Sequence, residues 1–263
     1  MSGTVVRRPA VAGMFYPADP TELRGMIDAF LKDAHTTGPV PKAIIAPHAG
    51  YIYSGAIAAS AYARLAPARH TIRRVVLLGP AHRIPFTGLA APAVDAFATP
   101  LGEVPIDKSA LAAIRDLPQV QVFDIAHSME HSLEVQLPFL QEVLDHFSVL
   151  PLCVGDASPE RIAMVLDKVW GGPETLIVIS SDLSHYQPYK AGRQMDKATS
   201  EAIEKLEPDD INYDQACGRL PIQGLLLVAR QRGLKVKTVD LRSSGDTAGP
   251  RDEVVGYGAY VFT

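Results

Sequence analysis

The chain of 263 residues has little of what membrane, secreted or disulfide-stabilised proteins require. No apolar stretch reaches membrane-spanning length. There are only two cysteines, Cys153 and Cys217, and they lie far apart, which predicts reduced thiols rather than a disulfide framework. The N-terminal segment lacks the long apolar core of an export signal. We therefore expect a cytoplasmic protein with no membrane partner.

Clustered positive charge and common catalytic loops are also missing. The net charge is -4 and the pI is about 6.1, and no basic cluster is longer than pairs such as Arg73-Arg74. These features exclude nucleic acid as the expected main ligand. No G-x-S-x-G elbow is present, and neither G-x-G-x-x-G nor G-x-x-x-x-G-K follows a strand, so serine hydrolases and nucleotide-binding enzymes are not supported.

The apolar residues, 47% of the chain, are arranged as an α/β protein. Runs rich in Val, Ile and Leu predict buried strands at 42–47, 73–80, 147–155, 174–182 and 235–244, with a final, edge strand at 254–262. Helical spacing occupies 20–34, 55–66, 107–116, 158–170, 188–206 and 220–232. This alternation predicts a single three-layer domain over residues 1–263, with a central, mainly parallel sheet flanked by helices.

Polar residues follow several of these strands directly. His48, His82 and Asp182 come after the first, second and fourth runs, His185 lies three residues further on, and Asp246 follows the fifth. In open α/β sheets, ligands bind outside the carboxyl ends of parallel strands. We therefore expect these five side chains to converge on one crevice.

Two imidazoles and one carboxylate with open positions form the ligand set typical of non-haem Fe(II) centres. The residues predict one divalent metal ion on His48, His82 and Asp246, with Fe2+ expected ahead of Zn2+ or copper. The alternative for each histidine taken alone is a hydrogen-bonded core or loop residue. The recurrence of such residues after separate strands favours the metal.

A competing motif is His127-Ser-Met-Glu-His131, which fits the H-x-x-E-H signature of inverted zinc peptidases. That signature needs both histidines on one helix, but Pro138 follows closely and would interrupt it. We expect a helix to begin near Pro138 instead, and Glu130 and His131 to line the crevice as polar neighbours of the metal ligands. For Cys217, which precedes Gly218, a buried packing thiol is favoured over a ligand or nucleophile.

Seven motifs in order carry a family resemblance: GMFYPAD, APHAGYIYSG, GPAH, EHSLEVQLPFL, SSDLSHY, ACGRLPI and SSGD. The chain resembles the MEMO family, whose prokaryotic members include those called AmmeMemoRadiSam system protein B. That family is similar in fold to class III extradiol dioxygenases. The resemblance implies that His48 and His82 bind metal and that Asp246 is the third ligand.

The resemblance also implies that His185 transfers protons and that Asp182 orients it. Tyr53 and Ser244, which lie within the matching motifs, are expected to support the metal ligands or to line the substrate pocket. Three functions stay open: an iron-dependent, dioxygenase-like oxidoreductase acting on a small aromatic or enolic substrate, a non-catalytic metal- or peptide-binding protein, and a zinc-dependent hydrolase.

Overall fold

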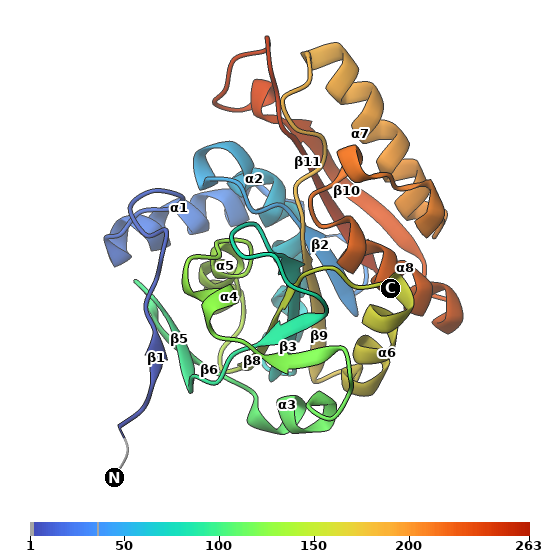
Figure 1. Ribbon diagram of the computed structural model, residues 1–263. Helices are drawn as coiled ribbons and strands as arrows, with labels where there is room; N and C mark the ends of the chain where they lie inside the picture. The colour runs from blue at the N-terminus through green and yellow to red at the C-terminus, as the bar shows by residue number, and fades with distance from the viewer. Residues whose placement is uncertain (1–2, 36) are drawn as a thin grey trace.

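The computed structural model describes residues 3–35 and 37–263, and its main feature is an eight-stranded sheet (Figure 1). The strands lie in the order β10 (Val236–Ser243), β11 (Gly256–Phe262), β2 (Ala43–Ala46), β9 (Thr175–Ser180), β3 (Arg74–Pro80), β8 (Ser148–Val154), β4 (Leu89–Ala91) and β7 (Val120–Val122).

The four central strands, β2, β9, β3 and β8, are parallel to one another. They are buried along nearly their whole length, which is why the sequence shows them as uninterrupted apolar runs. Strand β11 pairs antiparallel with both β10 and β2. The final segment is therefore an internal strand of the sheet, and the expectation of an edge strand is wrong, because β10 covers its outer side.

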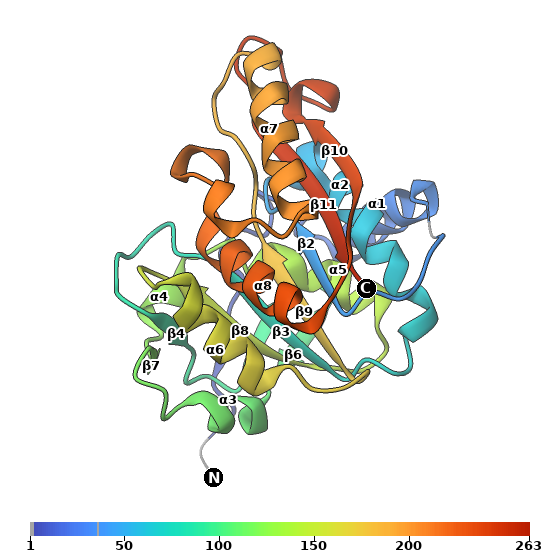
Figure 2. The same cartoon turned by 90° about the vertical axis from the view of Figure 1, so that its right-hand side faces the viewer.

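Helices cover both faces of the sheet, so the predicted α/β architecture is confirmed. Alternate residues of each central strand face opposite cores; Ile44 and Val75 pack with helices on one side, and Ile45 and Val76 with helices on the other. The first side carries α1 (Pro20–Asp33), α2 (Tyr51–Tyr62) and α5 (Leu137–Val143). The second, which faces the viewer in Figure 2, carries α6 (Pro159–Val169), α7 (Tyr189–Glu204) and α8 (Arg219–Arg232).

A second, three-stranded sheet contains β1 (Val6–Arg7), β5 (Ala96–Thr99) and β6 (Gly102–Pro105). These strands are too short to produce an apolar run, and the sequence did not predict them. Two further helices, α3 (Lys108–Ile114) and α4 (Ile125–Ser128), lie in the same part of the chain.

The longest helix, α7, has 16 residues and carries several charged side chains. Within the described ranges, no helix combines the length and the apolar character that crossing a membrane would need.

Candidate metal centre

His48 lies just past the end of β2 and is 1% exposed. Its Nδ1 is 2.9 Å from Ser180 Oγ. The single hydroxyl proton of Ser180 is donated to the carbonyl oxygen of Ser132 at 2.6 Å, and Gln136 Nε2 donates to the same hydroxyl at 2.7 Å. Ser180 therefore has only an acceptor position left for His48, so Nδ1 of His48 carries the proton. The lone pair of His48 is on Nε2, the usual position for binding a metal.

His82 follows β3 and is held by Glu130. One oxygen of Glu130 accepts the backbone N–H of His82 at 2.6 Å, and the other lies 2.9 Å from His82 Nδ1. Burial alone would raise the pKa of Glu130, but the hydrogen bonds from His82 and Ser132 outweigh burial and lower that pKa to about 2. The ionised carboxylate therefore accepts a hydrogen bond from the protonated Nδ1 and leaves His82 Nε2 free. Carboxylate–histidine pairs of this kind orient imidazoles that bind metals.

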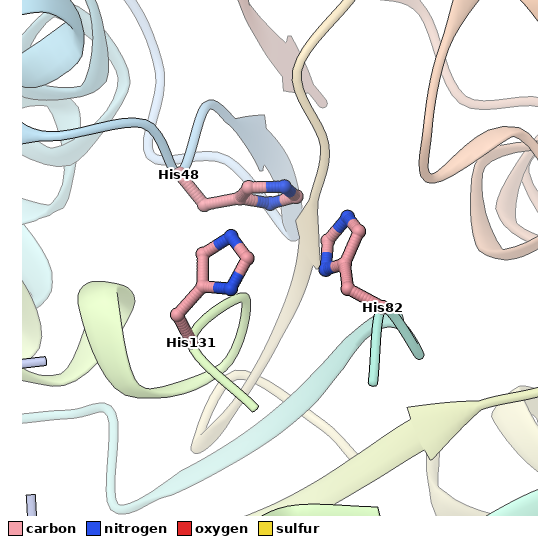
Figure 3. Close-up of side chains that lie close together, drawn as sticks. All are labelled: His48, His82 and His131. Atoms are coloured by element: carbon pink, nitrogen blue, oxygen red, sulfur yellow. The ribbon is translucent and has the colours of Figure 1, made fainter. Parts of the chain in front are cut away.

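His131 completes a histidine cluster with His48 and His82. One ring nitrogen of each residue lies within 4.8 Å of the other two, and Figure 3 shows the three rings gathered around a common point. The His131 ring stacks on that of His82 at 4.7 Å between centroids. Burial lowers the pKa of both His48 and His131, which favours the neutral imidazole that metals bind. His131, expected only as a polar neighbour of the ligands, is thus a third member of the cluster.

Cys217 adds a thiol beside this cluster. Its Sγ lies 3.3 Å from His48 Nε2 and 3.6 Å from the backbone oxygen of Asp182. The close approach depends on Gly218, because a Cβ there would lie 2.6 Å from the Cβ of Ser181. Burial raises the pKa of the Cys217 thiol to about 12, and nearby Asp182 adds to the effect. Packing alone therefore does not describe Cys217, since its thiol also faces Nε2 of His48.

Asp182 and His185 lie near the cluster. Asp182 was expected to orient His185, but the two side chains do not contact each other. Asp182 Oδ1 accepts the backbone N–H of His48 at 2.7 Å, and its Oδ2 is 3.9 Å from His48 Nε2. Burial raises the pKa of Asp182. His185 instead donates from Nδ1 to the backbone oxygen of Leu183 at 2.8 Å. Asp182 thus orients His48, and the Leu183 carbonyl orients His185 with Nε2 free.

Asp246, the predicted third ligand, is not part of the histidine cluster. Its carboxylate accepts hydrogen bonds from the Tyr189 hydroxyl at 2.6 Å and from the Ser243 backbone at 2.9 Å. Arg193 and Arg251 lie 3.6 and 3.5 Å from its oxygens. Burial opposes ionisation of Asp246, but these hydrogen bonds and Arg193 lower its pKa. Through Tyr189 and Arg193, the Asp246 carboxylate therefore holds its own loop against α7.

The remaining predicted residues have structural contacts. Ser244 accepts the Val255 N–H on Oγ at 3.0 Å, and Tyr53, in the first turn of α2, packs against the core. Neither residue lines the cavity described below. His127 is 3% exposed and its Nε2 is 2.9 Å from the Ala90 carbonyl. Helix α4 ends at Ser128, so His127 and His131 do not share a helix, as expected from Pro138.

A cavity of about 640 Å³ leads to the cluster. His82, His185 and Cys217 line it together with apolar residues that include Phe86 and Leu220. The nitrogen His131 Nδ1 is buried without a hydrogen-bond partner. Nε2 of His82 is free, Nε2 of His48 faces the Cys217 thiol, and His131 Nδ1 lies 3.4 Å from Glu130 Oε1 without forming a hydrogen bond. These three imidazoles fit a divalent transition metal.

The comparisons with known proteins agree with the motifs. Residues 7–261 match the family model described as Memo-like protein. The chain belongs to the MEMO family. A MEMO1 family protein from Aquifex aeolicus is 38% identical, with 98% of this chain and 99% of the relative covered. One from Archaeoglobus fulgidus is 35% identical with the same coverage.

Among solved structures, an uncharacterized protein from Escherichia coli K12 has a TM-score of 0.47 and 11% sequence identity. The similarity covers 82% of this chain and 98% of that one.

Proposed function

We propose that this MEMO-family protein binds one divalent metal ion on His48, His82 and His131, with Fe2+ favoured over Zn2+ or copper, and that it is an oxidoreductase acting on a small aromatic or enolic substrate. The observation that carries the proposal is the mutual approach of three imidazole nitrogens within 4.8 Å. Hydrogen bonds through Nδ1 leave Nε2 of two of these imidazoles free. Free cysteines at positions 153 and 217 fit a cytoplasmic setting.

The protein side chains have separate roles in this proposal. His48 and His82 bind the ion through Nε2, while Ser180 and Glu130 hold the rings in place. His185 accepts or donates a substrate proton at Nε2, because its Nδ1 is already bonded to Leu183. A bound ferrous ion would supply the capacity to exchange electrons with oxygen and substrate.

A zinc-dependent hydrolase is the second candidate, and the three-histidine set is compatible with it. Three histidines with an open fourth position form one of the ligand sets of catalytic zinc. Without Asp246, the cluster no longer has the two-histidine, one-carboxylate set on which the preference for iron was first based. The identity of the metal therefore separates the two candidates.

Elemental analysis of protein purified without oxygen tests the proposal. We expect about one equivalent of iron in the wild type, and its loss in His48→Ala and His82→Ala. Asp246→Asn is the control and should keep the metal. Cys217→Ser and His131→Gln, compared side by side, show whether the thiol or the third imidazole completes the ligand set.

Oxygen uptake with a panel of catechols then tests the activity. Uptake that needs His48 and His185 supports the oxidoreductase. Stoichiometric zinc with ester or amide hydrolysis supports the second candidate. Bound metal with neither activity indicates a non-catalytic metal- or peptide-binding protein, and a wild type without metal contradicts all metal-based functions.

A further inference from the structure

The cavity beside the histidine cluster contains one basic side chain other than histidine, that of Arg219. Arg219 is the first residue of α8 and follows the Cys217-Gly218 turn that brings the thiol to His48. Its guanidinium carbon lies 5.5 Å from the centre of the Tyr213 ring, which lines the same cavity. The turn therefore links Cys217, beside the proposed metal site, to Arg219, whose guanidinium is held next to the Tyr213 ring.

Unlike Arg7, Arg193 and Arg251, Arg219 has no acidic partner among the described residues. Arg7 pairs with Glu134, and Arg193 and Arg251 lie beside Asp246. In the described parts of the chain, no carboxylate lies within ion-pair distance of Arg219, and its recorded interaction is with the Tyr213 ring. A guanidinium presents a planar fork of donors that matches a carboxylate, and here that fork is available to a ligand.

The walls on either side of Arg219 are apolar. Ile84, Pro85 and Phe86 line one part of the cavity, and Leu220 and Pro221 line another. A volume of about 640 Å³ lies within the range of small-molecule sites. These walls suit a compact apolar body, and aromatic rings or conjugated chains fit beside Phe86.

The charges limit the ligand further. Three neutral imidazoles would leave the full charge of a divalent ion in place, and Arg219 adds another positive charge. Two acidic residues, Asp156 and Asp214, also line the cavity, and both are exposed to solvent. They oppose a ligand with several negative charges but leave a single carboxylate favourable.

We infer that the cavity binds small monocarboxylates with a planar apolar body, and that Arg219 holds the carboxylate. The inference deepens the proposed function by naming the substrate class, and it rests on that function for the chemistry at the metal. Contact between Arg219 and a carboxylate does not itself need the metal. Arg219 is thus assigned as a specificity-determining residue.

Calorimetric titration with three probes tests this assignment. Benzoate has both the charge and the ring, benzamide lacks the charge, and acetate lacks the ring. We expect wild-type protein to bind benzoate at least about tenfold more tightly than either benzamide or acetate, because a charge-assisted pair and apolar burial both contribute. The titrations use the full chain as purified and again after chelator treatment.

Two variants separate Arg219 from general electrostatics. Arg219→Gln should weaken benzoate binding about tenfold and leave benzamide binding unchanged. Arg83→Gln removes a cation next to His82 that does not line the cavity, and it should change benzoate binding less than about twofold. Arg219→Lys keeps the charge but loses the fork, so its benzoate affinity should fall between those of wild type and Arg219→Gln.

The inference is overturned if Arg219→Gln and Arg83→Gln lose benzoate affinity equally. It is also overturned if benzoate binding depends on Arg219 only while metal is present. Acetate binding as tight as benzoate binding overturns the apolar part of the substrate class. Metal content, measured in the same samples, should be unchanged in Arg219→Gln. Absence of metal from wild type contradicts the proposed function alone, because the chelator-treated titrations still test Arg219.

Discussion

The loops after β2 and β3 and the loop after β10 have similar sequences, since small residues and then a histidine or aspartate follow each strand. Strand β10 runs in the same direction as β2, because both are antiparallel to β11, so all three loops leave the same edge of the sheet. His48 and His82 nevertheless meet, and Asp246 does not join them.

Strand order separates Asp246 from His82. Only β9 lies between the strands that carry His48 and His82, whereas β11, β2 and β9 lie between β10 and β3. With neighbouring strands about 4.8 Å apart, β10 is roughly 19 Å from β3. A polar residue at the end of a strand therefore predicts the edge of the sheet at which it lies. The order of the strands decides which of these residues share a site.

Hydrogen bonding separates the two regions as well. In the histidine cluster, Ser180 and Glu130 occupy one nitrogen of His48 and His82 and leave the other free. At Asp246, Tyr189 and Ser243 occupy both carboxylate oxygens. The first region keeps ring nitrogens that no backbone or carboxylate group occupies, and the second stabilises its own loop.

The largest expected effect comes from Arg7, which supports the loop carrying Glu130 and His131 from β1. Its guanidinium donates to the backbone oxygens of His127 and Glu130 and pairs with buried Glu134 at 2.7 Å. Arg7→Ala should lower the free energy of unfolding by about 3–5 kcal/mol, because Glu134 stays buried without its cation. Arg251→Ala, at the exposed pair beside Asp246, should cost at most about 1 kcal/mol.

Urea unfolding of both variants measures the difference, and Arg7→Lys keeps a cation in case Arg7→Ala does not fold. Similar losses for Arg7→Ala and Arg251→Ala would show that the two loops are supported equally, contrary to the comparison.

The next-largest effect is expected at His127, whose contribution to the free energy of unfolding depends on pH. Burial lowers its pKa to about 4, against an ordinary value of 6.5. The unfolded chain therefore binds more protons between these values, so stability is complete above pH 6.5 and falls as the pH drops towards 4. The loss attributable to this group is about 3 kcal/mol.

His127→Gln tests this prediction, since the glutamine amide can replace the donor that faces the Ala90 carbonyl. Unfolding free energies measured from pH 7 to pH 4 should decline less steeply in this variant than in wild type. Parallel declines would assign the acid sensitivity to other groups.

The third-largest effect is expected at Glu130 and Ser180, which hold the proposed metal ligands in place. Glu130→Gln and Ser180→Ala should each weaken metal binding by about 10- to 100-fold, because the rings of His82 and His48 lose the partners that fix their proton positions. Competition with a coloured chelator measures the affinity. Unchanged affinity in both variants would mean that these contacts hold the fold alone.

The smallest effect is expected at Asp246. Asp246→Asn keeps the shape of the side chain and weakens its pairing with Arg193 and Arg251, which are partly exposed, so the unfolding free energy should change by about 1 kcal/mol or less. Metal affinity should stay within about twofold of wild type, since the side chain contacts neither His48 nor His82. Loss of metal from this variant would restore Asp246 as a ligand.

Much of the fold was predictable from the sequence because its central elements carry strong local signals. The four parallel strands are apolar throughout, and α1 and α6 begin at capping residues, Asp19 and Ser158. The short strands of the second sheet have no such signal. His48 and His82 were found for the same reason, since each follows a strong strand.

What the sequence determined by itself is the α/β architecture, the family and two of the three clustered histidines, because periodic burial and strand ends are local properties. Only the tertiary structure showed that His131 and Cys217 approach His48 and that Asp246 does not. These residues lie on loops whose positions depend on strand order and on distant contacts such as those of Arg7 and Gly218. Such contacts join residues far apart in the chain, so no local pattern records them.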